Sequence, residues 1–460
     1  MEQEIKIAEL ILEDIVVNDA DFSDALRKVF LKQADLRPFR PIVSGLVGCE
    51  LRHHLLFNYL VNAFSDEQLS KEEKRLLTLC MSNYYFYKRF NSEEMLAYVK
   101  NRLGDEKFNL VSEHLFKDGG DCKNLIPEHF TKTASNYLSL RFNTPEWVLK
   151  IWFHFEHGVT YKILKKNSKQ LTPSIRVRTS QISVEELLDK NQAFAKTPVD
   201  SILVYGGKEP LRKLEEFKSG KIFLEKCGTK NLLDNFSIHD PDQIFCYCGN
   251  KDDSVVLELI ERFGRDVAIN IGLPLVEKPE NVKEEAVIDE HLSLKKFVKA
   301  GCYSNINVFN ANPDSMNAYI SKPQDFVFAV PNSTNFDLIR EKPDYLLHFK
   351  KEKMDALFKQ EKDVLENSAS FVAEGGTLVY LIYTISKKEG ENTIKDFLAN
   401  HNEFKLVKME QRFPFDKYDT SMFYAILKKE TPLAKAGMPL NEVQSQNILQ
   451  SANMGAKQGE

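Results

Sequence analysis

The spacing of apolar residues changes partway along this 460-residue chain, and that change constrains the fold more than any other feature. Up to about residue 135, apolar residues such as Ile5, Ile7 and Leu10 recur at helical spacing, and β-rich runs are almost absent. From about Val199, short β-branched runs alternate with helical stretches. This order predicts a helical bundle followed by a doubly wound, mostly parallel sheet, because parallel strands need helical crossovers.

Nine short runs in the second half are candidate strands. They are "SILVY" (201–205), "GKIFLE" (220–225), "QIFCYC" (243–248), "DVAINI" (266–271), "NINVFN" (305–310), "DFVFAV" (325–330), "GTLVYLIY" (376–383), "FKLVKME" (404–410) and "MFYAILK" (422–428). Helical stretches separate several of them, which favours an α/β sheet. The last two runs are joined by a loop without a clear helix, so we expect an antiparallel hairpin at the sheet edge.

We expect four segments along the chain. A helical domain covers 1–135, a small linker module 136–198, and the doubly wound domain 199–430. A tail rich in Ala, Gln, Asn and Gly covers 431–460 and is predicted to be disordered. In the helical domain, Ser70 and Glu73 predict a capping box, and residues 39–61 predict one long, mostly buried helix.

The composition excludes several classes of protein. No apolar run approaches the length of a membrane span, and the acidic N-terminus is unlike a signal peptide, so we expect a cytoplasmic protein without membrane contact. Seven cysteines without paired spacing argue against a disulfide framework. Cys246-x-Cys248 is a poor zinc half-site, and no metal site is expected. No cysteine follows Cys302.

Positive charge is concentrated in one block of an otherwise acidic chain, whose formal net charge is −5. Between Ser139 and Thr179, eight basic residues face two acidic ones. A block of this kind is either a solvated face or a surface that meets phosphates, and charge alone does not choose between the two.

Several segments, taken in order, resemble the bacterial 16S ribosomal RNA cytosine-5 methyltransferases of the Sun/Fmu (RsmB-like) family. "SGLVGCELRHH" is similar to a helix of the NusB-like domain of that family, and "FNTPEWVLKIW" and "PSIRVRTSQISVEELL" are similar to its linker module. "LFKQEKDVLENSASFVAEGGTLVYLIYTISKKEGEN" resembles the run "Q..iL..a...lk.GGtLvYsTCtv...EN", and "MFYAILKK" its closing strand. The resemblance covers roughly residues 1–429. It implies a NusB-like bundle joined to a Rossmann-like domain that uses S-adenosylmethionine.

The resemblance also implies a chemistry whose residues are missing here. Members of the family add a cysteine thiolate to C6 of cytosine, which makes C5 able to attack the methyl donor, and a second cysteine helps to release the product. In this chain Tyr383 occupies the position of the nucleophile, and Asn332 that of the second cysteine. Ala329 replaces the acid that contacts the base. A phenol with a pKa near 10 and an amide do not replace thiols.

The donor-binding loop differs in the same way. The family sequence "DlCAAPGGKT" corresponds here to "CYCGNKDDSV", where Cys246 replaces the aspartate and Cys248 aligns with a cysteine that is not the nucleophile. The resemblance implies that this loop and the end of the next strand would hold the donor. The corresponding positions are Cys246, Cys248, Gly249, Lys251, Asp252, Asp253 and Asn270, with a third acidic position at Asn310 or Asn312.

RNA contact does not depend on this chemistry. Phosphate-binding candidates in the basic block are Lys162, Lys165, Lys166, Arg176 and Arg178. Trp147 and Tyr161 are aromatic residues that either stack on a base or anchor the module core. His53 and His54 have no metal-ligand partners in the sequence and are assigned surface or core roles.

Three functions remain open from the sequence. The first is an RsmB-like pseudoenzyme that has lost cytosine-5 methylation and binds RNA, of which ribosomal RNA is the type that the resemblance implies. The second is an active S-adenosylmethionine-dependent RNA methyltransferase with an unusual site. The third is a subunit that binds a protein partner through residues 1–135. Whether the chain is an enzyme therefore stays open at this point.

Overall fold

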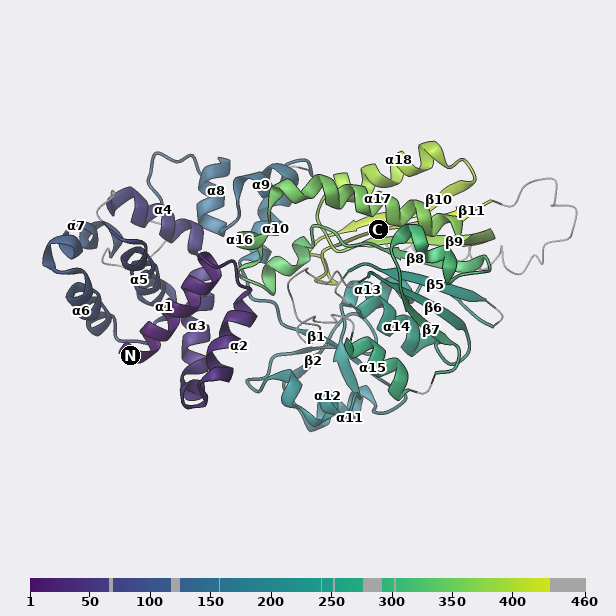
Figure 1. Cartoon of the computed structure of the whole chain (residues 1–460), viewed down its shortest axis with the longest axis horizontal. Coiled ribbons are helices and arrows are strands. Elements are labelled where there is room, and N and C mark those ends of the chain that lie inside the picture. Colours follow the sequence, from purple (N-terminus) through teal and green to yellow (C-terminus); the bar gives the residue numbers. More distant parts are fainter. Residues whose placement is uncertain are drawn as a thin grey trace, which may run out of the picture.

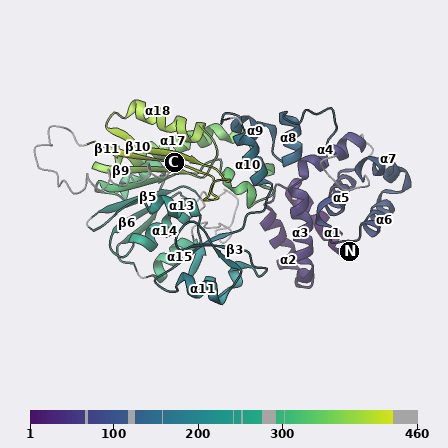
Figure 2. The same cartoon turned by 180° about the vertical axis from the view of Figure 1, so that it is seen from behind.

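The computed structural model describes residues 1–65, 69–116, 125–156, 158–240, 242–250, 253–275, 292–301 and 303–430. Figure 1 shows a helical part at one end, a large sheet with helices on both faces at the other, and a smaller sheet beside it. Figure 2 shows the same arrangement from behind. None of the described helices is long and apolar enough to cross a membrane.

Ten α-helices form the first part of the chain. They are α1 (Glu2–Val16), α2 (Phe22–Lys32), α3 (Arg40–Leu51), α4 (His54–Ser65), α5 (Lys71–Ser82), α6 (Ser92–Leu103), α7 (Asp105–Leu115), α8 (Ser135–Phe142), α9 (Glu146–Trp152) and α10 (Val159–Asn167). The capping box at α5 is confirmed, because the Ser70 hydroxyl accepts from Glu73 N–H and the Glu73 carboxylate accepts from Ser70 N–H. α8, α9 and α10 share the core of α4–α7, through residues that include Trp152 and Leu164.

The long helix predicted over residues 39–61 is broken in two. α3 ends at Leu51 and α4 begins at His54. The amide of Asn143, which follows α8, lies at the break: its Nδ2 donates to Leu51 O at 2.8 Å, and its Oδ1 accepts from Leu55 N–H at 2.9 Å. The Asn143 side chain thus satisfies backbone groups that the break in the helix would otherwise leave without partners. The apolar pattern of the sequence continues across this break, so it predicted one helix instead of two.

A four-stranded antiparallel sheet follows the helices, and it contains two strands that the sequence analysis assigned to the doubly wound sheet. Its order is β2-β3-β1-β4. The members are β1 (Ser174–Val177), β2 (Phe194–Lys196), β3 (Ile202–Tyr205) and β4 (Ile222–Leu224), with α11 (Val184–Lys190) and α12 (Glu215–Lys218) beside them. The runs "SILVY" and "GKIFLE" therefore pair with β1 rather than with the doubly wound sheet. Both runs pair antiparallel with β1, which lies between them, and only the 3-10 helix η4 (Leu211–Lys213) and the four-residue α12 separate them in the sequence.

The large sheet has seven strands in the order β10-β11-β9-β8-β5-β6-β7. They are β5 (Gln243–Cys248), β6 (Ala268–Leu273), β7 (Ile306–Asn310), β8 (Gln324–Val330), β9 (Val372–Ile382), β10 (Phe404–Arg412) and β11 (Met422–Lys429). Five neighbouring strands of this sheet, β9, β8, β5, β6 and β7, are parallel to one another. β10 and β11 form the predicted antiparallel hairpin at the edge of the sheet. The predicted Rossmann-like α/β class is confirmed, and all seven remaining strand predictions fall on these strands.

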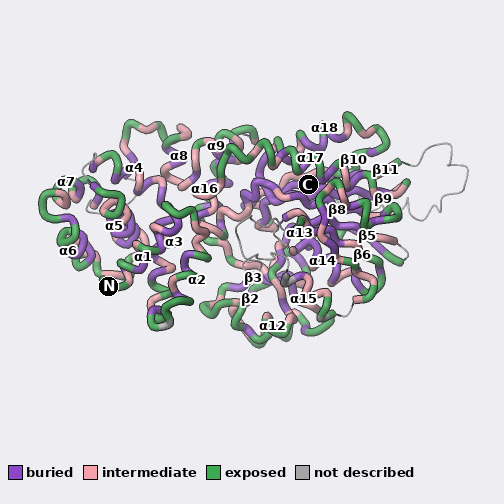
Figure 3. The backbone as a smooth tube through the Cα atoms, viewed as in Figure 1, coloured by how far each residue is buried: buried purple, intermediate pink, exposed green. Residues whose placement is uncertain are grey.

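Helices cover both faces of the large sheet (Figure 1). α13 (Cys227–Leu233), α14 (Ser254–Phe263) and α15 (Leu292–Ala300) pack on one face, and α17 (Met354–Ser370) and α18 (Thr393–Asn400) on the other. Side chains of β9 alternate between the two cores: Tyr380 and Ile382 face α17 and α18, whereas Leu381 and Tyr383 face α13 and α14. In Figure 3 the buried residues are concentrated in this sheet and in the centre of the helical part.

Candidate functional site

The candidate site lies where the carboxyl ends of β5, β8 and β9 meet, because ligands of doubly wound sheets bind at this edge. The segments that follow these strands are Gly249–Asn250, Pro331–Asn335 and Tyr383–Ser386. The sequence placed the catalytic positions and the donor loop in these same three segments.

Tyr383 is fully buried and fills the space between the sheet and two helices. Its phenol oxygen lies 2.6 Å from Thr229 Oγ1 on α13 and 3.2 Å from Ser254 Oγ, the first residue of α14. Lys226 Nζ lies over the ring, 4.0 Å from its centroid, and forms an ion pair with Asp337 at 2.6 Å. The side chain of Tyr383 thus packs against Ser254, near the end of the segment that the sequence assigns to the donor loop.

Amide side chains join the end of β5 to the loop after β8. Asn250 is 4% exposed, and its Nδ2 donates to Asn335 Oδ1 at 3.1 Å. Asn335 Nδ2 in turn donates to Asn332 Oδ1 at 2.8 Å. Gly249 N–H donates to Val330 O at 2.7 Å, and a Cβ on Gly249 would lie 3.1 Å from Asn332 N. The two loops therefore pack directly on each other, and Asn332 acts as a hydrogen-bond acceptor in this network.

A buried carboxyl pair behind this edge was not among the predicted site residues. Glu389, in the π-helical turn η9 (Lys388–Asn392), accepts from Thr334 N–H at 2.7 Å and from Thr334 Oγ1 at 2.8 Å. Glu361 of α17 is fully buried beside it. Burial, followed by the charge of Glu389, raises the pKa of Glu361 well above its usual range. The sequence signal for this pair is the acids Glu361 in "FKQEKD" and Glu389 in "KKEGEN", two runs within the segment that resembles the family.

Most of the remaining positions that the sequence assigns to the donor loop have apolar surroundings. Cys246 and Cys248 are fully buried, and burial raises the pKa of the Cys246 thiol. Ala329, at the position of the family acid, is fully buried as well. Asp253 is the N-cap residue of α14. Lys251, Asp252 and Cys302 lie outside the described residues, so the predicted placement of Lys251 and Asp252 stays a prediction.

Asn270 is not at the carboxyl edge, contrary to the sequence alignment. β6 continues to Leu273, and Asn270 pairs with Phe245 near the start of β5. Its amide donates to Gln324 Oε1 at 3.3 Å, at the beginning of β8. Asn310, in contrast, ends β7 at the correct edge, where its Nδ2 donates to Pro274 O at 2.8 Å. Asn312 lies just beyond, as the N-cap of a 3-10 turn.

Two of the predicted phosphate-binding residues form ion pairs that join the small sheet to α14. Arg176 is 8% exposed, and its Nε lies 2.9 Å from Oε2 of the fully buried Glu258. Arg178 Nε lies 2.7 Å from Glu261 Oε2. Both guanidinium groups hold the small sheet against the large domain, so the assignment of Arg176 and Arg178 to RNA is corrected to a structural role.

The lysines of α10 have a different environment. Lys162 and Lys165 are exposed, and Lys162 Nζ lies 5.6 Å from the centroid of the Phe415 ring. Lys166 is half-buried and pairs with Asp419 at 3.2 Å. Tyr161 is 46% exposed, whereas Trp147 packs against the rings of the sheet domain, with Phe349 stacked 5.6 Å away. The structure favours the core role for Trp147 and leaves Tyr161 open to a partner.

The two histidines lie at the break between α3 and α4. His54 Nδ1 lies 2.8 Å from Glu50 Oε1 in the helical core, and His53 stacks on Phe86 with ring centroids 3.6 Å apart. Across the described ranges, no group of three or more His, Cys, Asp or Glu is placed to hold a metal ion.

Comparison with known proteins agrees with this fold. Residues 294–427 match the family model of the 16S rRNA methyltransferase RsmB/F. The chain is 21% identical over 420 residues to the probable ribosomal RNA small subunit methyltransferase B of Bacillus subtilis, covering 85% of this chain and 88% of that protein. The chain is RsmB-like. The sequence alignment puts the positions of both family thiols at Tyr383 and Asn332, and this assignment stays a prediction.

Two solved structures show the same fold as this RsmB-like chain. The structure of PH0851 superposes with a TM-score of 0.67 and 18% identity, covering 92% of this chain and 99% of that one. A methyltransferase homolog protein from Pyrococcus horikoshii gives a TM-score of 0.51 at 14% identity, covering 65% of this chain and all of that one.

The RsmB-like family uses S-adenosylmethionine as its methyl donor, and the residues described here do not fit that molecule. At the edge where the donor would lie, Asn250 is buried and joined to Asn335, and Tyr383 is packed against Ser254. A donor seated there would have to break both contacts and move a fully buried ring. No step of methyl transfer is therefore derived for this chain.

Proposed function

We propose that this RsmB-like chain binds RNA without methylating cytosine. The observation that carries the proposal is the burial of Tyr383, whose phenol contacts Thr229 and Ser254 in the place where the family positions a reactive thiol. Ala329 and Asn332 supply neither the acid nor the second thiol of the family reaction.

The retained part of the function is contact with RNA through α10. Lys162 and Lys165 are exposed there, Tyr161 presents its ring beside them, and Phe415 lies under Lys162. Aromatic rings interleaved with cations are typical of surfaces that bind single-stranded nucleic acid, because rings stack on bases and cations meet phosphates. The resemblance to rRNA methyltransferases makes ribosomal RNA the first RNA to test.

Donor binding is the direct test of the lost chemistry. We expect calorimetric titration with S-adenosylmethionine to give no binding at concentrations up to about 1 mM, which corresponds to less than about 4 kcal/mol of binding free energy. The related Bacillus subtilis protein, titrated in parallel, controls for the quality of the donor. A dissociation constant in the micromolar range, or transfer of a labelled methyl group to RNA, would overturn the proposal.

Neutralising the α10 lysines tests the RNA surface. For the double substitution Lys162→Gln and Lys165→Gln, we expect weaker binding of single-stranded 16S rRNA fragments. The slope of log K against log salt concentration should fall in magnitude by about 1.4, because each lost phosphate contact removes about 0.7. The matched control replaces Lys353 and Lys359, two exposed lysines near and on α17, with Gln. An equal loss in both double variants would show a general charge effect and contradict a site on α10.

A further inference from the structure

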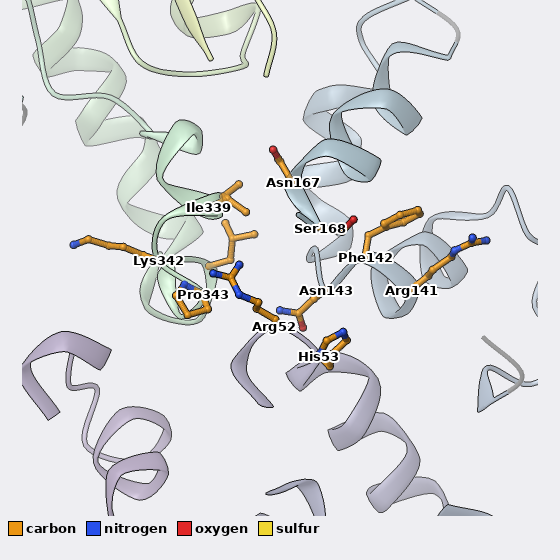
Figure 4. Close-up of a pocket in the computed structure, with 11 residues that line it drawn as sticks. Arg52, His53, Arg141, Phe142, Asn143, Asn167, Ser168, Ile339, Lys342 and Pro343 are labelled. Atoms are coloured by element: carbon orange, nitrogen blue, oxygen red, sulfur yellow. The ribbon is translucent and has the colours of Figure 1, made fainter. Parts of the chain in front are cut away.

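A cavity of about 60 Å³ lies at the junction of the helical part, α10 and the segment that follows β8. It is lined by residues that include Arg52, Asn143, Asn167, Ser168, Ile339 and Lys342. Figure 4 shows Arg52 reaching from the break between α3 and α4 toward Ile339 and Pro343, with Asn167 and Ser168 at the end of α10 above it. The cavity exists because Asn143 holds that break open.

The lining of the cavity is positively charged, and one of its cations, Lys342, forms an ion pair with Asp21 at 3.4 Å, which is not a lining residue. No aspartate or glutamate lines it, and three cationic side chains do: Arg52, Arg141 and Lys342. In Figure 4 the ends of Arg141 and Lys342 extend outward on opposite sides, so Arg52 is the cation nearest the centre. Within the described ranges no carboxylate pairs with Arg52, and its Nη2 donates a long hydrogen bond of 3.4 Å to Arg340 O. Burial lowers the pKa of this guanidinium, so it is costly to leave unpaired.

A second group in the cavity also has no partner. Asn167 is 8% exposed, and its Nδ2 has no acceptor in the part of the chain that the structure describes. A buried amide N–H that lacks an acceptor costs about 1–3 kcal/mol. Arg52 and Asn167 come from different helices, and both offer donors that an oxyanion would satisfy.

We propose that this cavity binds a phosphate group, held by the Arg52 guanidinium and the Asn167 amide. A volume of 60 Å³ is about four times the 15 Å³ that one water molecule needs, which suits an ion with four oxygen atoms. Arg141 and Lys342 at the rim raise the local concentration of anions. The group is either a free phosphate or a phosphate of an RNA chain. The site does not depend on the loss of methyl transfer or on the α10 surface.

Inorganic phosphate is the probe, with the full chain in low-salt buffer at pH 7. We expect saturable binding by calorimetry, and an increase in melting temperature with phosphate, since a ligand of the folded state stabilises it. Arg52→Gln should weaken binding at least about tenfold and abolish the thermal shift, whereas Arg52→Lys should retain part of both. Asn167→Asp keeps the shape of the side chain but adds a negative charge, so it should abolish binding. Arg265→Gln, on an exposed turn, is the matched control.

Competition identifies the source of the phosphate. If single-stranded RNA displaces inorganic phosphate from the wild type, the cavity holds an RNA phosphate; if it does not, the ligand is a free anion. Equal phosphate affinity in the wild type, Arg52→Gln and Asn167→Asp, or no saturable binding in the folded wild type, would overturn the proposal. Loss of RNA affinity in the α10 lysine variant with phosphate binding intact would leave this site standing.

Discussion

Replacing Arg176 with Met is expected to lower the free energy of unfolding by about 3–5 kcal/mol, because it leaves a buried charge without its partner. The carboxylate of Glu258 is fully buried, and burial already raises its pKa. Once Arg176 is removed, the nearest cation is Lys230, whose Nζ lies 3.8 Å from Glu258 Oε1. The small sheet would also lose its main polar contact with α14. Urea denaturation followed by far-UV circular dichroism measures the change.

A double variant separates the cost of the orphaned charge from that of lost packing. In Arg176→Met with Glu258→Met, neither charge is buried, and we expect most of the stability to return, since apolar pairs often replace buried ion pairs without loss. Arg212→Met, which removes an exposed arginine on the same small sheet domain, is the control and should change stability by less than about 0.5 kcal/mol. A double variant as unstable as the single one would show that packing, not charge, holds the interface.

Glu361→Gln is expected to raise stability at alkaline pH relative to the wild type. Glu361 and Glu389 are buried together, and Glu389 already accepts from Thr334, so Glu361 holds the proton. The native pKa of Glu361 lies above its unfolded value near 4.5, so the folded state binds one proton that the unfolded state releases. Stability is then fully present below pH 4.5 and is lost as pH rises toward the native pKa, with a slope of up to about 1.4 kcal/mol per pH unit.

Denaturation of both proteins from pH 5 to pH 9 measures this slope. Because glutamine stays uncharged at every pH, the difference between Glu361→Gln and the wild type should grow steadily with pH. Asp363→Asn, an exposed acid on the same helix, is the control and should follow the wild type. Parallel curves for Glu361→Gln and the wild type would mean that the pair does not hold a proton in the native state.

The sequence predicted the large sheet well, because its physical signal is local. Strands buried on both faces need continuous apolar runs, and all seven runs from "QIFCYC" onward became strands. The same applies to Ser70, whose capping interaction depends only on residues within one turn of α5. The assignment of the family thiol positions to Tyr383 and Asn332 rests on the same kind of local similarity, and it stays a prediction.

Interactions between distant segments could not be predicted in this way. The helix break at Arg52 depends on Asn143, about 90 positions later, and the ion pair of Arg176 depends on Glu258. Asn270 was misplaced because β6 continues to Leu273 through its pairing with both neighbouring strands, β5 and β7, which the residues of β6 alone do not reveal. The short strands β3 and β4 were assigned to the wrong sheet, since apolar runs do not specify their partners.

The order of strands in the large sheet bears on how the protein is made. Among the described residues β11 is the last strand, yet it lies between β9 and β10 and pairs with both. During synthesis, the edges of β9 and β10 that pair with β11 therefore stay unpaired until residues 422–429 have emerged from the ribosome. Unpaired strand edges are prone to aggregate. A nascent or prematurely terminated chain that ends before Met422 would expose these apolar strands to chaperones and proteases, even though every other element had already been translated.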